Sequence, residues 1–169
     1  MAGRHVALEA AGGQLRWPGG QTRAAFGRGG IRADKKEGDG ATPSGTFPLL
    51  SGFYRADRVP ALRTDLAMRP LGRADGWVDD PADPDYNRLV ALPYPARVEE
   101  LWREDGLYDV LVVIGYNTDP VVPGAGSAIF LHVARPDFSP TDGCVAVARD
   151  TLIALLRVLG PGSTITIRA

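Results

Sequence analysis

The sequence contains one cysteine, Cys144, in the tetrapeptide Thr141-Asp142-Gly143-Cys144. A lone cysteine can form neither an intramolecular disulfide nor a multi-cysteine metal site, so it is either an inert buried thiol or a nucleophile. One of the two histidines, His132, ends an apolar run upstream of this cysteine. Because a thiol becomes nucleophilic near neutral pH when a base helps to form its thiolate, His132 and Cys144 form a candidate catalytic pair.

The backbone around the cysteine could also take part in catalysis. The N–H groups of Gly143 and Cys144 could stabilise an oxyanion if they converge on one point. A metal site is less well supported, because one cysteine and two histidines show no ligand-spacing pattern.

Two strands and a helix are expected to position this pair. Tyr108 to Tyr116 reads YDVLVVIGY, a β-forming run that predicts a strand buried on both faces. Ser127 to Val133 predicts a second central strand, which ends near His132. A proline-containing loop then leads to Cys144. The apolar spacing of Arg149 to Leu159 predicts the one helix, which Gly160-Pro161 ends.

The rest of the chain is divided by 21 glycines and 14 prolines into short segments typical of β structure. Residues 57–105 are predicted to form a long excursion with little regular structure, and residues 99–104 a helical turn at most. Asn117 to Gly126 is predicted to be a loop. Further strands are predicted at His5 to Ala10 and Gln14 to Trp17 (a hairpin across Gly12-Gly13), at Gln21 to Arg28, Gly45 to Leu50 and Gly52 to Arg55, and at Ser163 to Arg168.

The composition limits the class of protein. A chain of 169 residues, 44% hydrophobic, predicts one folded domain spanning residues 1–169. Nineteen basic and twenty acidic residues nearly cancel, which argues against a general nucleic-acid binder. No apolar run approaches the ~20 residues of a membrane span. The N-terminus lacks the apolar region of a secretory signal.

Two separated segments carry a family resemblance. His132 followed by Thr141-x-Gly143-Cys144 resembles the active-site signature of L,D-transpeptidases of the YkuD type, which runs from a histidine through a variable loop to Ser/Thr-His-Gly-Cys. The segment from Gly38 to Pro48, GDGATPSGTFP, resembles the family's Gly-x-x-x-Thr-Pro-x-Gly-x-Phe stretch. Two matches in the right order are more specific than either alone, and the resemblance covers most of residues 25–167.

The resemblance implies a mainly β fold, an L,D-transpeptidase-like β-sandwich or barrel of short strands with one helix near the C-terminus. It implies that Cys144 attacks a peptidoglycan stem peptide, that a D-amino acid leaves, and that the acyl group passes to a diaminopimelate amine. His132 would be the base. This chemistry needs no metal or cofactor. The protein is expected to be a monomer that acts in the periplasm or cell wall. It would take part in cell-wall organisation and cell shape, and carbapenems would inhibit it.

The sequence departs from the family signature beside the nucleophile. Asp142 stands where a histidine usually precedes Gly-Cys, Ala146 where a polar residue is often found, and Val133 where glycine is common. A carboxylate facing the sulfur would raise the pKa of the thiol. Asp142 is therefore expected to point away, to pair with a cation such as Arg135, or to meet a substrate ammonium.

Several residues are candidates for binding substrate. Arg135 would bind a stem-peptide carboxylate, since arginine does so bidentately. The other candidates are Thr141, Asp142 and Tyr116.

Three readings of function remain open. The cross-links could be 3→3, or 1→3 with L-alanine as the acyl donor. The same nucleophile could transfer its acyl group to water, as in an amidase or L,D-carboxypeptidase. The chain could also be an inactive wall-binding module.

Overall fold

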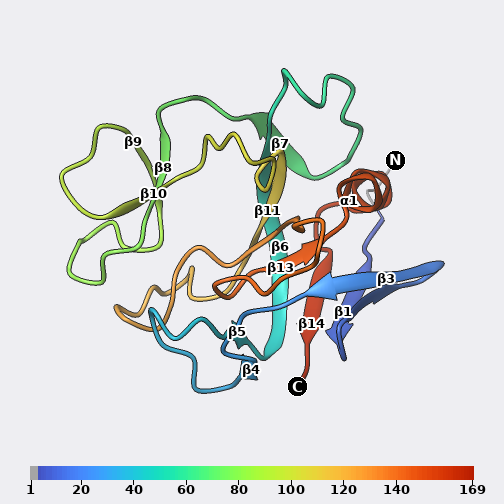
Figure 1. Cartoon of the computed structure of the whole chain (residues 1–169), viewed down its shortest axis with the longest axis horizontal. Coiled ribbons are helices and arrows are strands. Elements are labelled where there is room, and N and C mark those ends of the chain that lie inside the picture. The colour runs from blue at the N-terminus through green and yellow to red at the C-terminus, as the bar shows by residue number, and fades with distance from the viewer. Residues whose placement is uncertain (1–3) are drawn as a thin grey trace.

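Strands dominate the computed structural model, which describes residues 4–169 (Figure 1). Nine of them form one sheet, and the additional pairing of β11 with β6 closes eight of these strands into a ring. β7 extends the sheet beside the second half of β6. The sheet consists, in order, of β11 (Val110–Ile114), β12 (Phe130–Val133), β13 (Val145–Val147), β3 (Gly20–Ala25), β2 (Gln14–Trp17), β1 (Ala7–Ala11), β14 (Thr164–Ile167), β6 (Gly45–Tyr54) and β7 (Ala67–Pro70).

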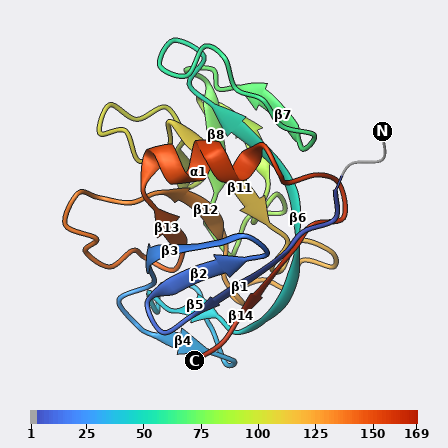
Figure 2. The same cartoon turned by 90° about the vertical axis from the view of Figure 1, so that its right-hand side faces the viewer.

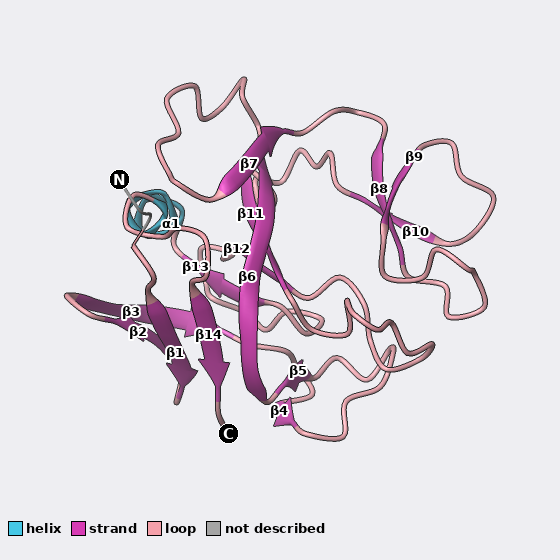
Figure 3. Cartoon of the chain, turned by 180° about the vertical axis from the view of Figure 1, so that it is seen from behind, coloured by secondary structure: helices cyan, strands magenta, loops and turns pink. Residues whose placement is uncertain are grey.

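Two smaller sheets and one helix complete the fold. β10 (Val98–Glu100), β8 (Asp75–Val78) and β9 (Leu89–Ala91) form a three-stranded sheet, and β4 (Ile31–Arg32) pairs with β5 (Thr42–Pro43). Helix α1 (Arg149–Leu156) packs on β11 and β12 (Figure 2). The three-stranded sheet of β8, β9 and β10, called the small sheet below, and α1 lie on opposite sides of β11 (Figure 3). No helix within residues 4–169 is long and apolar enough to cross a membrane.

The side chains of β11 point alternately into two apolar clusters on the two faces of the strand. Val110, Val112 and Ile114 point into a cluster that includes Leu152 and Leu156 of α1. Leu111 and Val113 point into the other cluster. Its further members are Phe53, Leu71, Trp77, Leu101, Leu107, Tyr108, Ala128, Phe130 and Cys144. Side chains alternate between faces along a strand, so a strand buried on both faces must be apolar throughout, as β11 is.

Most predicted elements are confirmed. The fold is mainly β and barrel-like with one helix near the C-terminus. The hairpin is present, and the buried strand at 110–114 lies inside the predicted run. The helix ends three residues earlier than predicted, at Leu156, but Leu159 remains buried on the same core.

Three expectations were wrong. The segments 45–50 and 52–55 are one continuous strand, β6, in which Gly52 pairs with Val112 of β11 on one side and with Met68 of β7 on the other. Residues 98–100 are a strand and not part of a helical turn. The excursion at 57–105 contains β7 to β10. Its side chains Leu71, Trp77 and Leu101 pack in the same apolar cluster as Cys144. The strand β13 was not predicted, because it is only three residues long.

Candidate active site

The parallel pairing of β12 with β13 brings the two predicted catalytic residues onto one face. His132 lies opposite Ala146 in the register, and Cys144 immediately precedes β13. Because alternate residues share a face, Cys144 and Ala146 project on the same side as Phe130 and His132. His132 and Cys144 accordingly line the same cavity.

His132 is held in one tautomer. Its Nδ1 lies 2.9 Å from the carbonyl oxygen of Val133. A carbonyl only accepts hydrogen bonds, so Nδ1 carries the proton and Nε2 is the basic nitrogen. The ring is 5% exposed and stands edge-on to Tyr108, with 5.2 Å between ring centroids. Burial lowers the pKa of His132 to about 4, so the imidazole is neutral at pH 7.

The Cys144 thiol is buried and protonated. Its Sγ donates to the carbonyl oxygen of Ala128 at 3.2 Å and accepts from the N–H of Phe130 at 3.4 Å. Burial raises the pKa of the thiol to about 12, and the charge of Glu99 adds to the rise. Within residues 4–169 no hydrogen bond joins Cys144 to His132, so the resting pair consists of a neutral thiol and a neutral imidazole.

The segment Gly38 to Pro48 forms the wall behind the cysteine. Thr42 is fully buried, and its Oγ1 accepts the N–H of Gly27 at 2.8 Å. Gly27 in turn bridges to Thr141. A side chain at Gly143, whose φ is +138°, would place its Cβ 2.8 Å from the carbonyl oxygen of Ala41. The two sequence motifs therefore pack against each other, and glycine at 143 is required by both backbone conformation and space.

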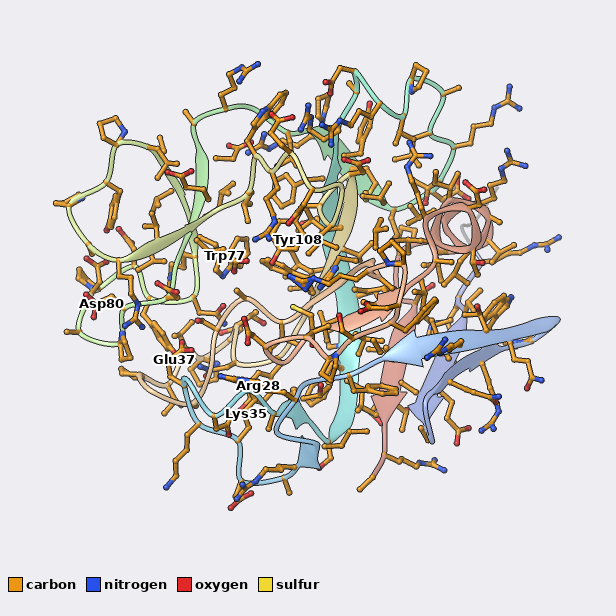
Figure 4. All side chains as sticks on the ribbon, viewed as in Figure 1. Arg28, Lys35, Glu37, Trp77, Asp80 and Tyr108 are labelled. Atoms are coloured by element: carbon orange, nitrogen blue, oxygen red, sulfur yellow. The ribbon has the colours of Figure 1, made fainter. Side chains whose placement is uncertain are left out.

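The cavity above the pair has a volume of about 610 Å³ and carries both signs of charge. This is within the range of small-molecule sites, roughly 300–1,000 Å³. Its charged residues come from loops and from β10 of the small sheet; Glu37 is labelled among them in Figure 4. They are Glu37, Asp79, Arg97, Glu99, Arg103, Arg135 and Asp142. The arrangement suits a zwitterionic ligand whose reacting carbonyl reaches the sulfur.

The family comparison agrees with this geometry. The model of the L,D-transpeptidase catalytic domain, YkuD, matches residues 4–167. The chain belongs to the L,D-transpeptidase catalytic domain family. No curated protein matches the sequence.

Two solved L,D-transpeptidases show a distant likeness to this family member. Mycobacterium tuberculosis L,D-transpeptidase 1 is 12% identical, with a TM-score of 0.48. An L,D-transpeptidase from Mycobacterium smegmatis is 13% identical, with a TM-score of 0.48. In each comparison the match covers 99% of this chain and 60% of the solved chain, so this chain spans less than two thirds of those proteins.

The structure places the other predicted site residues of this L,D-transpeptidase domain in different settings. Asp142 is 92% exposed and lies 3.5 Å from a guanidinium nitrogen of Arg28; the pairing with Arg135 is not formed. Arg135 is exposed and lines the cavity. Tyr116 does not line it: its hydroxyl donates to the Ala125 carbonyl oxygen at 2.6 Å, and its ring packs against Phe47.

Thr141 closes the turn that carries the cysteine. Its hydroxyl donates to the carbonyl oxygen of Cys144 at 2.7 Å and accepts the N–H of Gly143 at 3.1 Å. An oxyanion would have to compete with this hydroxyl for the Gly143 N–H. The assignment of Gly143 and Cys144 as oxyanion donors stays a prediction.

Sequence reasoning missed a buried pair, Tyr108 and Glu99, which lines the same cavity as the candidate catalytic residues. The Tyr108 hydroxyl donates to Glu99, and burial raises the pKa of both groups. Glu99 lies on β10, which was expected to be a helical turn. Prediction of a strand at 98–100 would have indicated that the Glu99 side chain points to the opposite face from its two neighbours. Within the described residues, no cluster of three or more His, Cys, Asp or Glu residues could hold a metal ion.

Replacing Gly143 by alanine tests the packing of the two motifs. The new methyl would meet the Ala41 carbonyl, so Gly143→Ala is expected to lower the free energy of unfolding by about 2–4 kcal/mol, measured with urea. Gly30→Ala is the control. Gly30 also has a positive φ, +78°, but no atom within 4 Å of an added Cβ. It should lose only about 1 kcal/mol. Equal losses would show that Gly143 is needed only for its backbone conformation.

The neutral resting pair predicts a characteristic pH profile. Because the thiol pKa is raised to about 12, the thiolate fraction should grow about tenfold for each pH unit between pH 6 and 10. The rate of alkylation by iodoacetamide should follow this slope, with Cys144→Ala giving no labelling. A rate that levels off below pH 8 would contradict a neutral pair and indicate a preformed thiolate.

Proposed function

We propose that this domain is a peptidoglycan L,D-transpeptidase that forms stem-peptide cross-links through a thioester on Cys144. The observation that carries the proposal is the placement of Cys144 and His132 on the floor of one cavity, with Nε2 of His132 left as the base. Membership of the L,D-transpeptidase catalytic domain family supports the same reaction class. The substrates would be two stem peptides, one acyl donor and one amine acceptor.

Acylation needs the thiol proton to move as the sulfur attacks. Since the resting thiol is protonated, Nε2 of His132 takes the proton as Sγ bonds to the donor carbonyl carbon. The tetrahedral intermediate collapses by breaking the C–N bond to the terminal D-amino acid. His132 then gives the proton to the leaving amine, and a thioester on Cys144 remains.

Deacylation reverses the proton transfers with a new nucleophile. The side-chain amine of a diaminopimelate on a second stem attacks the thioester carbon, and His132 removes a proton from this amine. The C–S bond breaks, the new amide is released, and the proton returns to Sγ. Splitting one difficult exchange into two thioester steps is what a cysteine nucleophile contributes.

The charges of the cavity suggest roles for two residues at its rim. Arg135 is exposed there and would bind a stem-peptide carboxylate. Asp142, exposed beside Arg28, would bind the ammonium of the incoming or donor stem. A cell-wall substrate implies action in the periplasm or cell wall, and carbapenems would acylate the same sulfur.

Variants of the nucleophile and of the two histidines test the mechanism. Cys144→Ala should abolish cross-link formation on purified muropeptides. His132→Ala should lower turnover by roughly 10²–10⁴-fold, as expected for loss of a general base, without unfolding the domain. His5→Ala, on the exposed N-terminal segment, should retain full turnover. Activity in Cys144→Ala, or equal effects of the two histidine variants, would refute the assignment.

Mass spectrometry of the muropeptide products separates the remaining readings. 3→3 dimers would identify a tetrapeptide donor, and 1→3 dimers an L-alanine donor. Release of shortened monomers without dimers would mean that water is the acceptor. Binding to sacculi with an unreactive Cys144 would identify a wall-binding module and refute the proposal.

Charge variants at the cavity rim test substrate binding. Arg135→Ala is expected to raise KM for the donor peptide by about tenfold, which corresponds to loss of a charge-assisted hydrogen bond of ~1.4 kcal/mol. Asp142→Asn should raise KM for the amine acceptor and leave the donor KM unchanged. Arg63→Ala, an exposed arginine that does not line the cavity, is the control. Unchanged KM values in both rim variants would remove these roles.

A further inference from the structure

Asn87, in the connection between β8 and β9, is a buried side chain that the reaction described above does not use. It is 4% exposed and has a left-handed backbone, with φ of +58°. Its Oδ1 accepts the indole N–H of Trp77 at 2.8 Å and the backbone N–H of Ala128 at 3.0 Å. Its Nδ2 donates to the carbonyl oxygen of Asn117 at 2.7 Å. One amide thus joins the small sheet to the loop after β11 and to the segment before β12.

The Ala128 backbone is held in an unfavourable conformation. Its φ is +54°, in the left-handed region, which is unfavourable for a residue with a Cβ. Such a conformation persists only where surrounding contacts impose it. The hydrogen bond from Ala128 N–H to Asn87 is a contact of this kind, and it is buried.

The conformation of Ala128 determines what the sulfur meets. The carbonyl oxygen of Ala128 accepts the thiol proton of Cys144, and the Phe130 N–H two residues later donates to the same sulfur. Trp77 packs edge-on against Phe130, with 5.1 Å between ring centroids, so the small sheet supports this segment at a second point. Figure 4 shows Trp77 and Tyr108 projecting from neighbouring segments into this region.

We propose that Asn87 is a positioning residue for the nucleophile. It holds the backbone of Ala128 so that the Ala128 carbonyl oxygen continues to accept the hydrogen bond from the Cys144 thiol. The inference rests on the proposed role of Cys144 as nucleophile. In the resting state the S–H of Cys144 donates to the Ala128 carbonyl oxygen and not to His132, so the S–H must turn about the Cβ–Sγ bond before His132 can take the proton. A hydrogen bond from the neutral thiol opposes ionisation, and the small sheet thereby keeps the nucleophile unreactive between substrates.

Other charged and titratable groups around the sulfur act on it from several elements. The charges of Glu99 and Asp142 oppose formation of a thiolate, and buried Lys35 favours it. Tyr108 is neutral, because burial raises its pKa, and its hydroxyl donates to Glu99. His132 lines the same cavity as a neutral ring. The Asn87 substitutions described next leave all five groups in place, so a change in thiol reactivity would come from the Ala128 peptide.

The test measures alkylation of Cys144 in the whole chain, which needs no turnover. Asn87→Ala frees the Ala128 peptide and is expected to accelerate alkylation at pH 8 about fivefold or more, since a thiol pKa lower by about one gives about tenfold more thiolate. Asn87→Asp retains the oxygen that accepts the Ala128 N–H, and should react no faster than the unchanged protein. The matched control is Ser163→Ala. It removes a fully buried hydroxyl that accepts two backbone N–H groups away from the cavity.

Three outcomes would overturn the inference. One is an Asn87→Ala rate equal to that of the unchanged protein or of Ser163→Ala. Another is equal acceleration in Asn87→Ala and Asn87→Asp. The third concerns the size of the reagent. Iodoacetamide and the smaller methyl methanethiosulfonate should be accelerated by the same factor. A larger gain for the bulkier reagent would mean that the cavity has merely opened, and would also overturn it.

A measurement on the unchanged protein covers the case in which Asn87→Ala fails to fold. The Ala128 amide should exchange with solvent at least ~100-fold more slowly than an unprotected amide, as a buried bonded N–H does. Exchange at the unprotected rate would refute the bond to Asn87. Absence of cross-linking activity in a protein with the expected alkylation results would instead refute the proposed function alone.

Discussion

The site depends on the parallel pairing of β12 with β13, which sets His132 opposite Ala146 and places Cys144 one residue before the strand. Parallel neighbours need a crossover connection, and here residues 134–144 provide it without a helix. This connection is fixed where Thr141 bridges to Gly27, and Gly27 is bonded to buried Thr42. The distant Gly38 to Pro48 motif therefore supports the turn that carries Cys144 through the Thr42 hydroxyl and the Ala41 carbonyl group.

Burial has opposite effects on the two reacting groups and leaves both neutral. The imidazole loses its proton more readily, and the thiol holds its proton more tightly. In the proposed mechanism such a neutral pair reacts when substrate brings a carbonyl carbon to the sulfur and proton transfer accompanies attack. Trp77 and Asn87 of the small sheet and its connection support the segment whose carbonyl group accepts the thiol hydrogen bond.

Residue pattern alone predicted the parts of the fold that local sequence determines. The apolar run at 108–116, the Gly12-Gly13 turn and the leucine spacing of α1 each encode their own structure. Two motifs in order predicted a pair, His132 and Cys144, whose members line one cavity. The role of Asn87 could not be predicted, because a polar residue between aspartates and prolines gives no sign of burial. Its partners lie about 10 to 41 residues away in sequence. Pairing of Asp142 with a cation was one of the expected alternatives. That the cation is Arg28 and not Arg135 could not be predicted, since Arg28 approaches it only through the folding of the first half of the chain.

The central claim is that Cys144 carries the acyl group between donor and acceptor. Intact-mass spectrometry of the protein mixed with a stem tetrapeptide, quenched in acid before an amine acceptor is added, tests this most directly. The account predicts a mass increase equal to the peptide less its terminal D-amino acid, located on Cys144 and removed by the acceptor amine as cross-linked product forms. Product formation without any adduct on the sulfur, or an adduct on another residue, would contradict it.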